Sequence, residues 1–159
     1  MIEVQNAIKT FDGNQVLKNV SAIFEAGKTN LIIGQSGSGK TVLMKSIVGI
    51  HRIDSGHILY DGRDITIMKR KQLNQLRREI GMLFQGSALF DSMTVLENVR
   101  FPLDMFSDET EDEKDRRARF CLERVELSHA VDLYPSEISG GMQKRAAIAR
   151  AIVLNPKYL

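Results

Sequence analysis

Apolar and polar residues alternate near the N-terminus, as they do in strands with one buried face. Residues 2–11 and 15–25 have this pattern on either side of an Asp-Gly pair at 12–13, which favours a tight turn. Residues 57–65 contain a further apolar segment that runs into a second Asp-Gly pair at 61–62. We therefore predict a two-stranded hairpin, followed later in the chain by a strand, a turn and the start of another strand.

Two shorter segments are apolar almost throughout. Residues 29–34 and 80–85 have the composition of strands that are buried on both faces. Apolar residues with helical spacing follow the first segment at 40–50, and residues 71–78 predict a short helix. This alternation of strands and helices favours an α/β fold for residues 1–85.

The pattern becomes helical after the second apolar segment. Thr94 and Glu97 have the spacing of a capping box at a helix start. Residues 107–127 run from acidic to basic, as the helix dipole favours, and a further helix is predicted at 141–154. We interpret residues 86–137 as a helical insert. The residues expected to face its core and that of the last helix are Ala118, Cys121, Leu122, Val125, Met142, Ala146, Ala149 and Val153.

Composition and charge exclude several classes of protein. The 159 residues carry a net charge of +2, too small to indicate a nucleic-acid partner, and the single cysteine excludes an internal disulfide. No apolar run approaches the ~20 residues that span a bilayer, and the N-terminus lacks the pattern of a secretory signal. We expect a cytoplasmic protein that reaches a membrane only through a partner.

One segment indicates nucleotide binding. GQSGSGKT at 34–41 fits the phosphate-loop pattern G-x-x-x-x-G-K-[ST], between a predicted strand and a predicted helix. The glycines allow backbone N–H groups to approach phosphate oxygens. Lys40 would reach the β- and γ-phosphates, and the Thr41 hydroxyl would ligate Mg²⁺. The predicted cradle comprises Gly34, Gln35, Ser36, Gly37, Ser38, Gly39, Lys40 and Thr41.

Four further segments give the phosphate loop a specific context. KTF ends at Phe11, FQ ends at Gln85, GIHRIDSGHILYDGRDI lies between the loop and Gln85, and ISGGMQKRAAIARAI occupies 138–152. In this order and spacing the chain resembles the ATP-binding-cassette (ABC) ATPase family over essentially all of its length. The resemblance implies an α/β P-loop NTPase fold of ABC type, with an N-terminal antiparallel β subdomain, part of a RecA-like core and a helical subdomain.

The resemblance also implies domain boundaries and nucleotide contacts. We expect one partial ABC ATPase domain, with residues 1–85 for nucleotide binding, 86–137 as the helical subdomain and 138–159 as the signature helix and the start of the Walker B region. The implied cofactors are ATP and Mg²⁺. Phe11 matches the aromatic that stacks on adenine, and Val16 would pack beside the base. Gln85 matches the glutamine that ligates Mg²⁺ and senses the γ-phosphate, which gives Lys40 and Gln85 the implied catalytic roles.

A second glycine-rich segment opens the last predicted helix. Ser139, Gly140 and Gly141 match the family signature, in which a hydroxyl and backbone N–H groups meet a phosphate. Met142 departs from the family, which often has glutamine after the two glycines. The phosphate loop covers only part of a nucleotide, so we expect a head-to-tail homodimer in which each signature closes the partner's site.

The resemblance implies partners at the membrane. ABC transporter ATPases lie on the inner face of the cell membrane, bound to an integral-membrane permease. FQGSALFDSMTVLENVRFPL and SGGMQKR look like the ATPases of bacterial lipid transporters that work with MCE proteins, which implies phospholipid transport and an MCE-type substrate-binding protein. Leu89, Phe90 and Met93 would either form apolar docking surface for the permease or fill the core of the insert; both interpretations stay open.

Some family motifs are missing from the sequence. The Walker B strand, with its two carboxylates, would normally come directly after NPKYL at 155–159, and the switch histidine would come later. We therefore expect these residues to have an incomplete core and almost no hydrolytic activity alone. The alternatives are an importer ATPase for another small solute, a soluble ABC ATPase outside transport, and a non-catalytic nucleotide-binding fragment. The absence of heptads and of a cysteine cluster argues against the soluble class.

Overall fold

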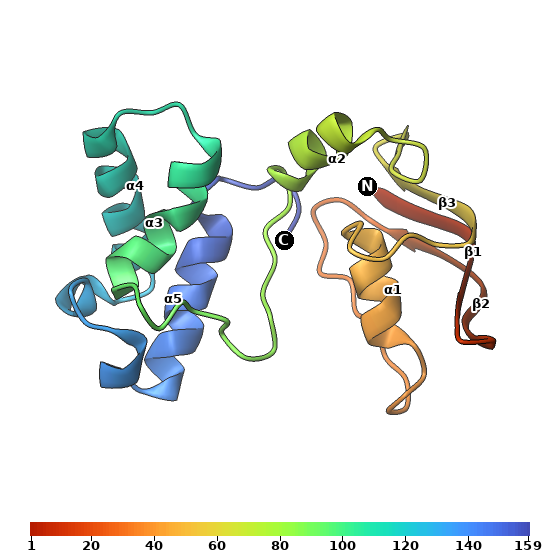
Figure 1. The fold of residues 1–159 in the computed structure, drawn as a ribbon, viewed down its shortest axis with the longest axis horizontal. Coiled ribbons are helices and arrows are strands. Elements are labelled where there is room, and N and C mark those ends of the chain that lie inside the picture. The colour runs from red at the N-terminus through yellow and green to blue at the C-terminus, as the bar shows by residue number, and fades with distance from the viewer. The chain divides into compact units, whose positions relative to one another are not determined.

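The computed structural model describes all residues from 1 to 159. The chain forms two compact units, Met1–Gln75 and Leu76–Leu159. The first unit contains a sheet and the helix α1, and the second contains the three longest helices (Figure 1). The division at residues 85 and 137 that the sequence suggested stays a prediction.

A four-stranded antiparallel sheet of order β2-β1-β3-β4 forms most of the first unit. Its strands are β1 (Ile2–Phe11), β2 (Asn14–Phe24), β3 (Ser55–Tyr60) and β4 (Arg63–Asp64). Both Asp-Gly pairs form the turns, with φ of 46° at each aspartate and 79° at each glycine. These left-handed values are easiest for glycine and are tolerated by aspartate. The predicted hairpin and the later strand-turn-strand are therefore confirmed.

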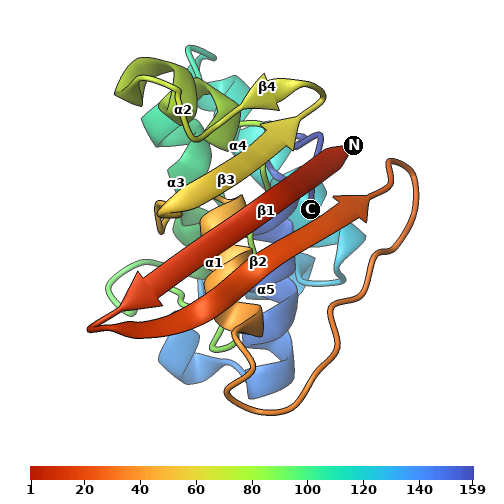
Figure 2. The same ribbon diagram turned by 90° about the vertical axis from the view of Figure 1, so that its right-hand side faces the viewer.

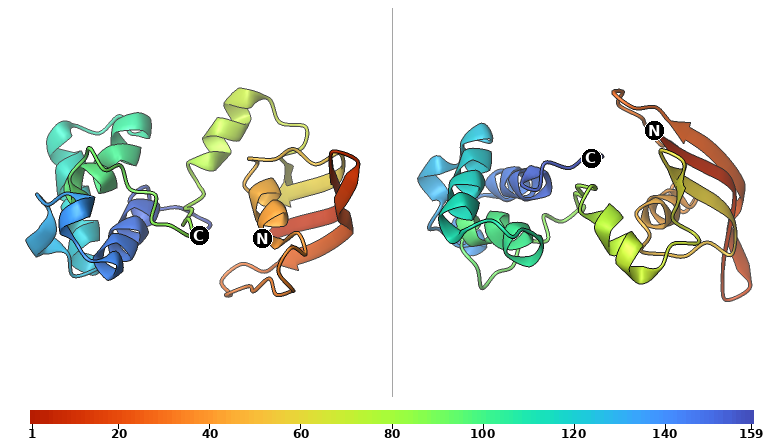
Figure 3. Two further views of the ribbon diagram at one scale, coloured as in Figure 1. Left: turned by 60° about the horizontal axis from the view of Figure 1, so that its bottom comes forward. Right: turned by 90° about the horizontal axis from the view of Figure 1, so that it is seen from above.

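The helix α1 (Lys40–Ile47) lies behind the sheet in Figure 2, and Figure 3 shows the same two layers from other directions. The Tyr60 hydroxyl, in β3, donates a hydrogen bond of 2.9 Å to the carbonyl oxygen of Ile47 at the end of α1. Leu43 and Ile47 are buried on the inner face of the helix. The sheet contributes Val4, Ala7, Leu17, Ile58 and Tyr60 to the same core.

Three helices pack around one apolar core in the second unit (Figures 1 and 3). They are α3 (Val95–Phe106), α4 (Glu111–Arg124) and α5 (Gly140–Ile152). Two 3-10 turns, Ser128–Ala130 and Pro135–Glu137, lie between α4 and α5, and the short helix α2 (Arg70–Arg77) crosses the boundary of the two units. No helix of the chain has the length and apolar character that crossing a membrane requires.

The helix starts and core stripes of the second unit agree with the predicted pattern. The Thr94 hydroxyl accepts from the backbone N–H of Glu97, and the Glu97 carboxylate accepts from that of Thr94, so the capping box is confirmed. Thr110 and Glu113 form a second box, which the sequence pattern did not predict. Of the predicted core residues, Val125 and Met142 are partly buried against the core, and the fully buried ones are Ala118, Cys121, Leu122, Ala146, Ala149 and Val153.

The two predicted buried strands are wrong. Residues 29–34 enter no ladder, and Leu31 and Ile33 are about four-fifths exposed, at 82% and 80%. Residues 80–85 form only an isolated parallel bridge, Ile80↔Tyr158. A strand that is buried on both faces needs neighbours on both edges to pair its N–H and C=O groups. Residues 29–34 pair with no neighbour and residues 80–85 pair only near Tyr158, so their apolar composition alone does not make them strands.

A buried asparagine organises the irregular segment before α3. The side chain of Asn98 is fully buried, and its amide donates to the carbonyl oxygens of Phe90, Met93 and Thr94 at 3.0, 3.0 and 2.9 Å. Its Oδ1 atom accepts from the backbone N–H of Phe90 at 2.7 Å. The carbonyl oxygens of Thr94 and Phe90 also accept from the backbone N–H groups of Asn98 and Met93. The side chain therefore matters most for the N–H group of Phe90 and the carbonyl oxygen of Met93, which belong to no helix or strand.

We predict that Asn98→Ala lowers the free energy of unfolding by about 2–4 kcal/mol, because the N–H group of Phe90 and the carbonyl oxygen of Met93 lose their partner and a buried side chain is truncated. Urea denaturation followed by circular dichroism measures this change. Asn98→Asp is the matched control for volume, since it keeps the shape and the acceptor but cannot donate. A variant Asn98→Asp as stable as the wild type would contradict the assignment of the three donated bonds.

Candidate functional site

The phosphate-loop residues 34–41 lead directly into α1. Gly39 is the N-cap of this helix and supplies no side chain to cap it, and the first turn contains no acidic residue. The first N–H groups of α1 therefore lack an acceptor from a side chain, and the positive end of the helix dipole faces the loop. Such a terminus is suited to bind an anion.

Glycines are required at the turn of this loop. Gly37 and Gly39 have φ of 79° and 91°, in the left-handed region. A Cβ atom at position 39 would also lie 3.1 Å from the carbonyl oxygen of Val16 and 3.3 Å from its Cγ1 atom. Val16 thus supports the loop from β2, a contact that the sequence did not predict. Its implied role beside the base stays a prediction.

Lys40 is held inside the loop. Its Nζ atom donates hydrogen bonds of 2.8 Å to the carbonyl oxygen of Gly34 and 2.6 Å to that of Gln35. The ammonium group is therefore fixed by its own loop, beside the N-terminus of α1. Thr41, the next residue, is exposed, so its hydroxyl is accessible to a ligand. The loop combines a cation, uncapped N–H groups and a hydroxyl within a few residues.

Phe11 lies at the end of β1 and is 38% exposed. The ring of His51 meets it edge to face at 5.4 Å between centroids, and the Lys9 Nζ atom lies 5.2 Å from its centroid. The Asp54 carboxylate accepts from Lys9 and from the backbone N–H of Thr10, both at 2.7 Å, and these bonds lower the pKa of Asp54. The segment 51–54 therefore holds the end of β1.

The second unit contains the other predicted site residues. Gln85 is exposed in an irregular segment. Ser139 is the N-cap of α5, and its Oγ atom accepts from the N–H of Met142 at 3.2 Å. A Cβ atom at Gly140 would meet nothing within 4 Å, and one at Gly141 would meet only Ser139 Oγ at 3.8 Å. Nothing inside the chain requires glycine here, although glycine weakens a helix.

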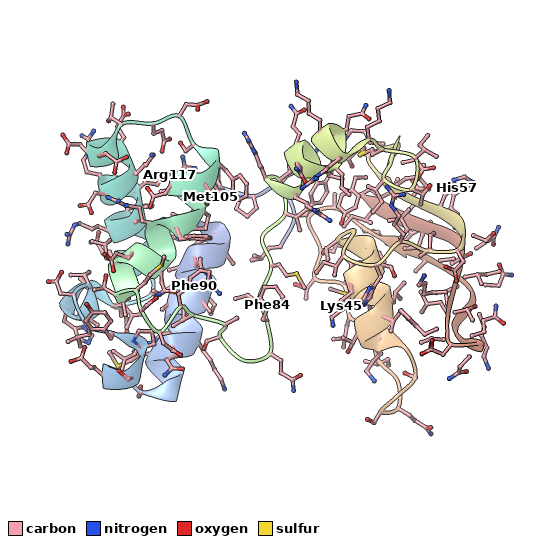
Figure 4. The ribbon with its side chains drawn as sticks, viewed as in Figure 1. Lys45, His57, Phe84, Phe90, Met105 and Arg117 are labelled. Atoms are coloured by element: carbon pink, nitrogen blue, oxygen red, sulfur yellow. The ribbon has the colours of Figure 1, made fainter.

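The two open interpretations of residues 89–93 apply to different side chains. Leu89 packs against the helical core, and Met93 is half-buried. Phe90 is 42% exposed and contacts the ring of Phe101 at 4.8 Å between centroids. Figure 4 shows Phe90 just before α3 and Phe84 in the extended segment that precedes Gln85. Leu89 therefore fills the core, and a docking role for Phe90 and Met93 stays a prediction.

Comparison with known protein families identifies the family of this chain. A family model described as ABC transporter matches residues 17–159. The chain belongs to the ABC transporter ATPase family. This chain is 38% identical to the methionine import ATP-binding protein MetN of Clostridium acetobutylicum over 159 residues, which are 100% of this chain and 49% of that protein. It is 39% identical to the probable ribonucleotide transport ATP-binding protein mkl of Mycobacterium leprae, over 99% of this chain and 46% of that protein.

Solved structures confirm the ABC-type P-loop fold. A dimeric structure of the ATP-binding cassette MJ0796 in a post-hydrolysis state, bound to ADP and Pi, matches with a TM-score of 0.88 and 33% identity, over 98% of this chain and 71% of that one. The cassette cbiO1 of Clostridium perfringens matches with a TM-score of 0.86 and 32% identity, over 98% of this chain and 62% of that one. The chain spans about half the length of the curated relatives it matches.

The glycines of the two loops are expected to respond to alanine in opposite directions. Gly39→Ala should lower the free energy of unfolding by about 1–3 kcal/mol, because alanine is strained at φ 91° and crowds Val16. Gly141→Ala should raise it by about 0.5 kcal/mol, because the new methyl group meets open space in a helix. Chemical denaturation of both variants measures the two changes; destabilisation by Gly141→Ala would show an internal role for that glycine.

Proposed function

We propose that the chain binds ATP with Mg²⁺ and is part of the ATP-hydrolysing subunit that powers a membrane transporter. The geometry of the phosphate loop carries this proposal: Lys40 lies inside a glycine-rich turn at the uncapped start of α1. A triphosphate brings several acceptor oxygens to such a site. Its oxygens would replace the carbonyl oxygens of Gly34 and Gln35 as partners of the ammonium group, and the helix N–H groups would bind the others.

The residues present fit Mg²⁺ held mainly by the nucleotide. No cluster of three His, Cys, Asp or Glu side chains that could hold a metal ion occurs in the chain. Mg²⁺ commonly binds through substrate phosphates, one or two protein oxygens and water. The Thr41 hydroxyl and the Gln85 amide oxygen, both of exposed residues, would be those protein ligands. The metal supplies charge neutralisation of the phosphates, while Lys40 and Gln85 orient the γ-phosphate.

Phe11 is proposed as the platform for the adenine base. A ring that is partly exposed at a strand end and fixed from behind is suited to stacking. The edge contact with His51 and the anchoring of Lys9 and Thr10 by Asp54 support this role. The base would stack on the open part of the Phe11 ring, with Val16 beside it.

The signature residues are proposed to act on the nucleotide of a second identical subunit. Gly140 and Gly141 leave open space where side chains would fit, which is useful only if an external group approaches the backbone. The N-terminus of α5 would then meet the γ-phosphate from the side that the phosphate loop leaves open. MJ0796, a structural relative, is described as a dimer.

The transported substrate has two candidates. We infer a lipid or phospholipid system with a permease and an MCE-type protein from the segments 84–103 and 139–145. The names of the relatives, methionine import and ribonucleotide transport, support a second candidate, the ATPase of an importer for another small solute. The ATPase would bind the permease on the cytoplasmic face of the membrane, with Phe90 in the contact. Co-purification with the membrane partners, then ATPase assays with phospholipid, methionine or ribonucleotides, separates the two candidates.

We predict that Lys40→Ala weakens ATP binding by the intact subunit by about 10- to 100-fold, the loss expected for charge-assisted hydrogen bonds to phosphate. Isothermal titration calorimetry measures the affinity. Lys45→Ala is the matched control, because Lys45 lies on the same helix but in its last turn (Figure 4). Equal affinity in Lys40→Ala and wild type would overturn the assignment of the phosphate loop.

A mixture of two variants tests the composite site. Lys40→Ala and Ser139→Arg subunits should each be inactive alone, because every site of such a homodimer carries one defect. In the mixed dimer one site carries both defects and the other carries neither. We expect partial recovery of ATPase activity on mixing. No recovery in dimers proven to be mixed would mean that each signature serves its own chain.

A further inference from the structure

The guanidinium group of Arg150, near the end of α5, binds two consecutive carbonyl oxygens. Its Nη1 atom donates to the carbonyl oxygen of Ala88 and its Nη2 atom to that of Ser87, both at 2.7 Å. Ala88 has φ of 50°, so the chain turns at this point. Two short charge-assisted bonds from one planar group define both the position and the orientation of the segment that they hold.

Arg150 carries a charge that no carboxylate balances. It is half-buried, and no Asp or Glu oxygen forms an ion pair with it, in contrast to Arg100, Arg117 and Arg119. Desolvation by burial lowers the pKa of its guanidinium. Burying a charge is costly unless hydrogen bonds compensate for the lost water. Here both compensating bonds reach the segment just after Gln85.

A second contact ties the same segment to α5. The hydroxyl of Ser87 donates to the Oε1 atom of Gln143 at 3.3 Å, and the Nε2 atom of Gln143 donates to the carbonyl oxygen of Pro135 at 2.8 Å. Gln143 lies one turn after Ser139, and its backbone N–H donates to the Ser139 carbonyl oxygen. The residues after Gln85 are thus held at two points along the helix that begins with the signature.

We propose that Arg150 is a positioning residue, which fixes the segment that carries Gln85 on the signature helix so that Gln85 and Ser139 move together. This inference rests on the proposed function, in which Gln85 contacts the γ-phosphate of its own subunit and Ser139 that of the partner. Arg150 itself contacts neither nucleotide. With such a rigid link, nucleotide binding at Gln85 also changes the position of Ser139 at the partner's nucleotide, because both motifs are held on the same helix.

Arg150→Lys is the sharpest variant, since lysine keeps the positive charge but lacks the fork that reaches two carbonyl oxygens at once. We expect kcat for ATP to fall by about 10- to 100-fold in the intact subunit, because Gln85 is misplaced. ADP affinity should stay within about twofold, because ADP has no γ-phosphate for Gln85 to contact. Amide hydrogen exchange at residues 86–90 should rise, while exchange in α5 stays unchanged.

Arg145→Lys is the matched control. Arg145 lies on the same helix and also binds consecutive backbone carbonyl oxygens, those of Val125 at 2.9 Å and Glu126 at 3.4 Å, but these lie at the end of α4. Arg145→Lys should therefore lower the melting temperature about as much as Arg150→Lys does, because each variant loses one such pair of bonds, but it should leave kcat unchanged. If Arg150→Lys does not fold, Ser87→Ala decides, since it removes the contact with Gln143 alone; we then expect kcat to fall by about threefold at unchanged ADP affinity.

The outcomes distinguish a failure of the positioning role of Arg150 from a failure of the proposed function. A wild-type subunit that binds no ATP would overturn the proposed function itself. Normal wild-type activity with an unchanged kcat in Arg150→Lys, or in Ser87→Ala where that variant decides, would overturn the positioning role alone. Equal losses of kcat in Arg150→Lys and Arg145→Lys would also overturn it, because the loss would then reflect general stability of the helical unit.

Discussion

The first backbone N–H groups of α1 have no acceptors within the helix, and the loop before it gives them no capping side chain. The rest of the candidate site depends on these N–H groups, which need an acceptor from outside the helix. Gly37 and Gly39 turn the chain so that these groups face the loop, and a Cβ atom at Gly39 would crowd Val16. Lys40 adds the charge that a polyanion needs. A capped and solvated helix start would offer none of these properties.

The other helix terminus of interest, that of α5, has a different physical basis. Ser139 caps it through the N–H of Met142, and the two glycines after it face open space. The function proposed for it therefore depends less on unmet hydrogen bonds than on access for an external phosphate. Farther along, Gln143 and Arg150 hold the segment 87–88. The same helix thus has the proposed ligand site at its start and holds the segment 87–88 farther along.

Irregular backbone in the second unit is stabilised by single polar side chains. Asn98 satisfies the segment 90–94, and Arg150 satisfies 87–88. Backbone groups without a ladder or a helix need such partners when they are shielded from water. Neither residue was recognised from the sequence, because a buried asparagine or arginine on a helix looks like any other polar position until the facing backbone is known. A polar residue on an apolar helical face, as at Asn98, is the one signal that was present.

The sequence alone determined whatever depends on local spacing. The Asp-Gly turns, the capping box at Thr94, the apolar stripes and the phosphate loop are each set by residues a few positions apart, and all were predicted. Tertiary structure decided what depends on distant partners. Residues 29–34 and 80–85 are apolar enough for buried strands, yet a strand exists only when neighbours pair with it. Likewise Val16 behind Gly39, His51 against Phe11 and Arg150 beside Ser87 are contacts between residues far apart in the sequence, which no local pattern encodes.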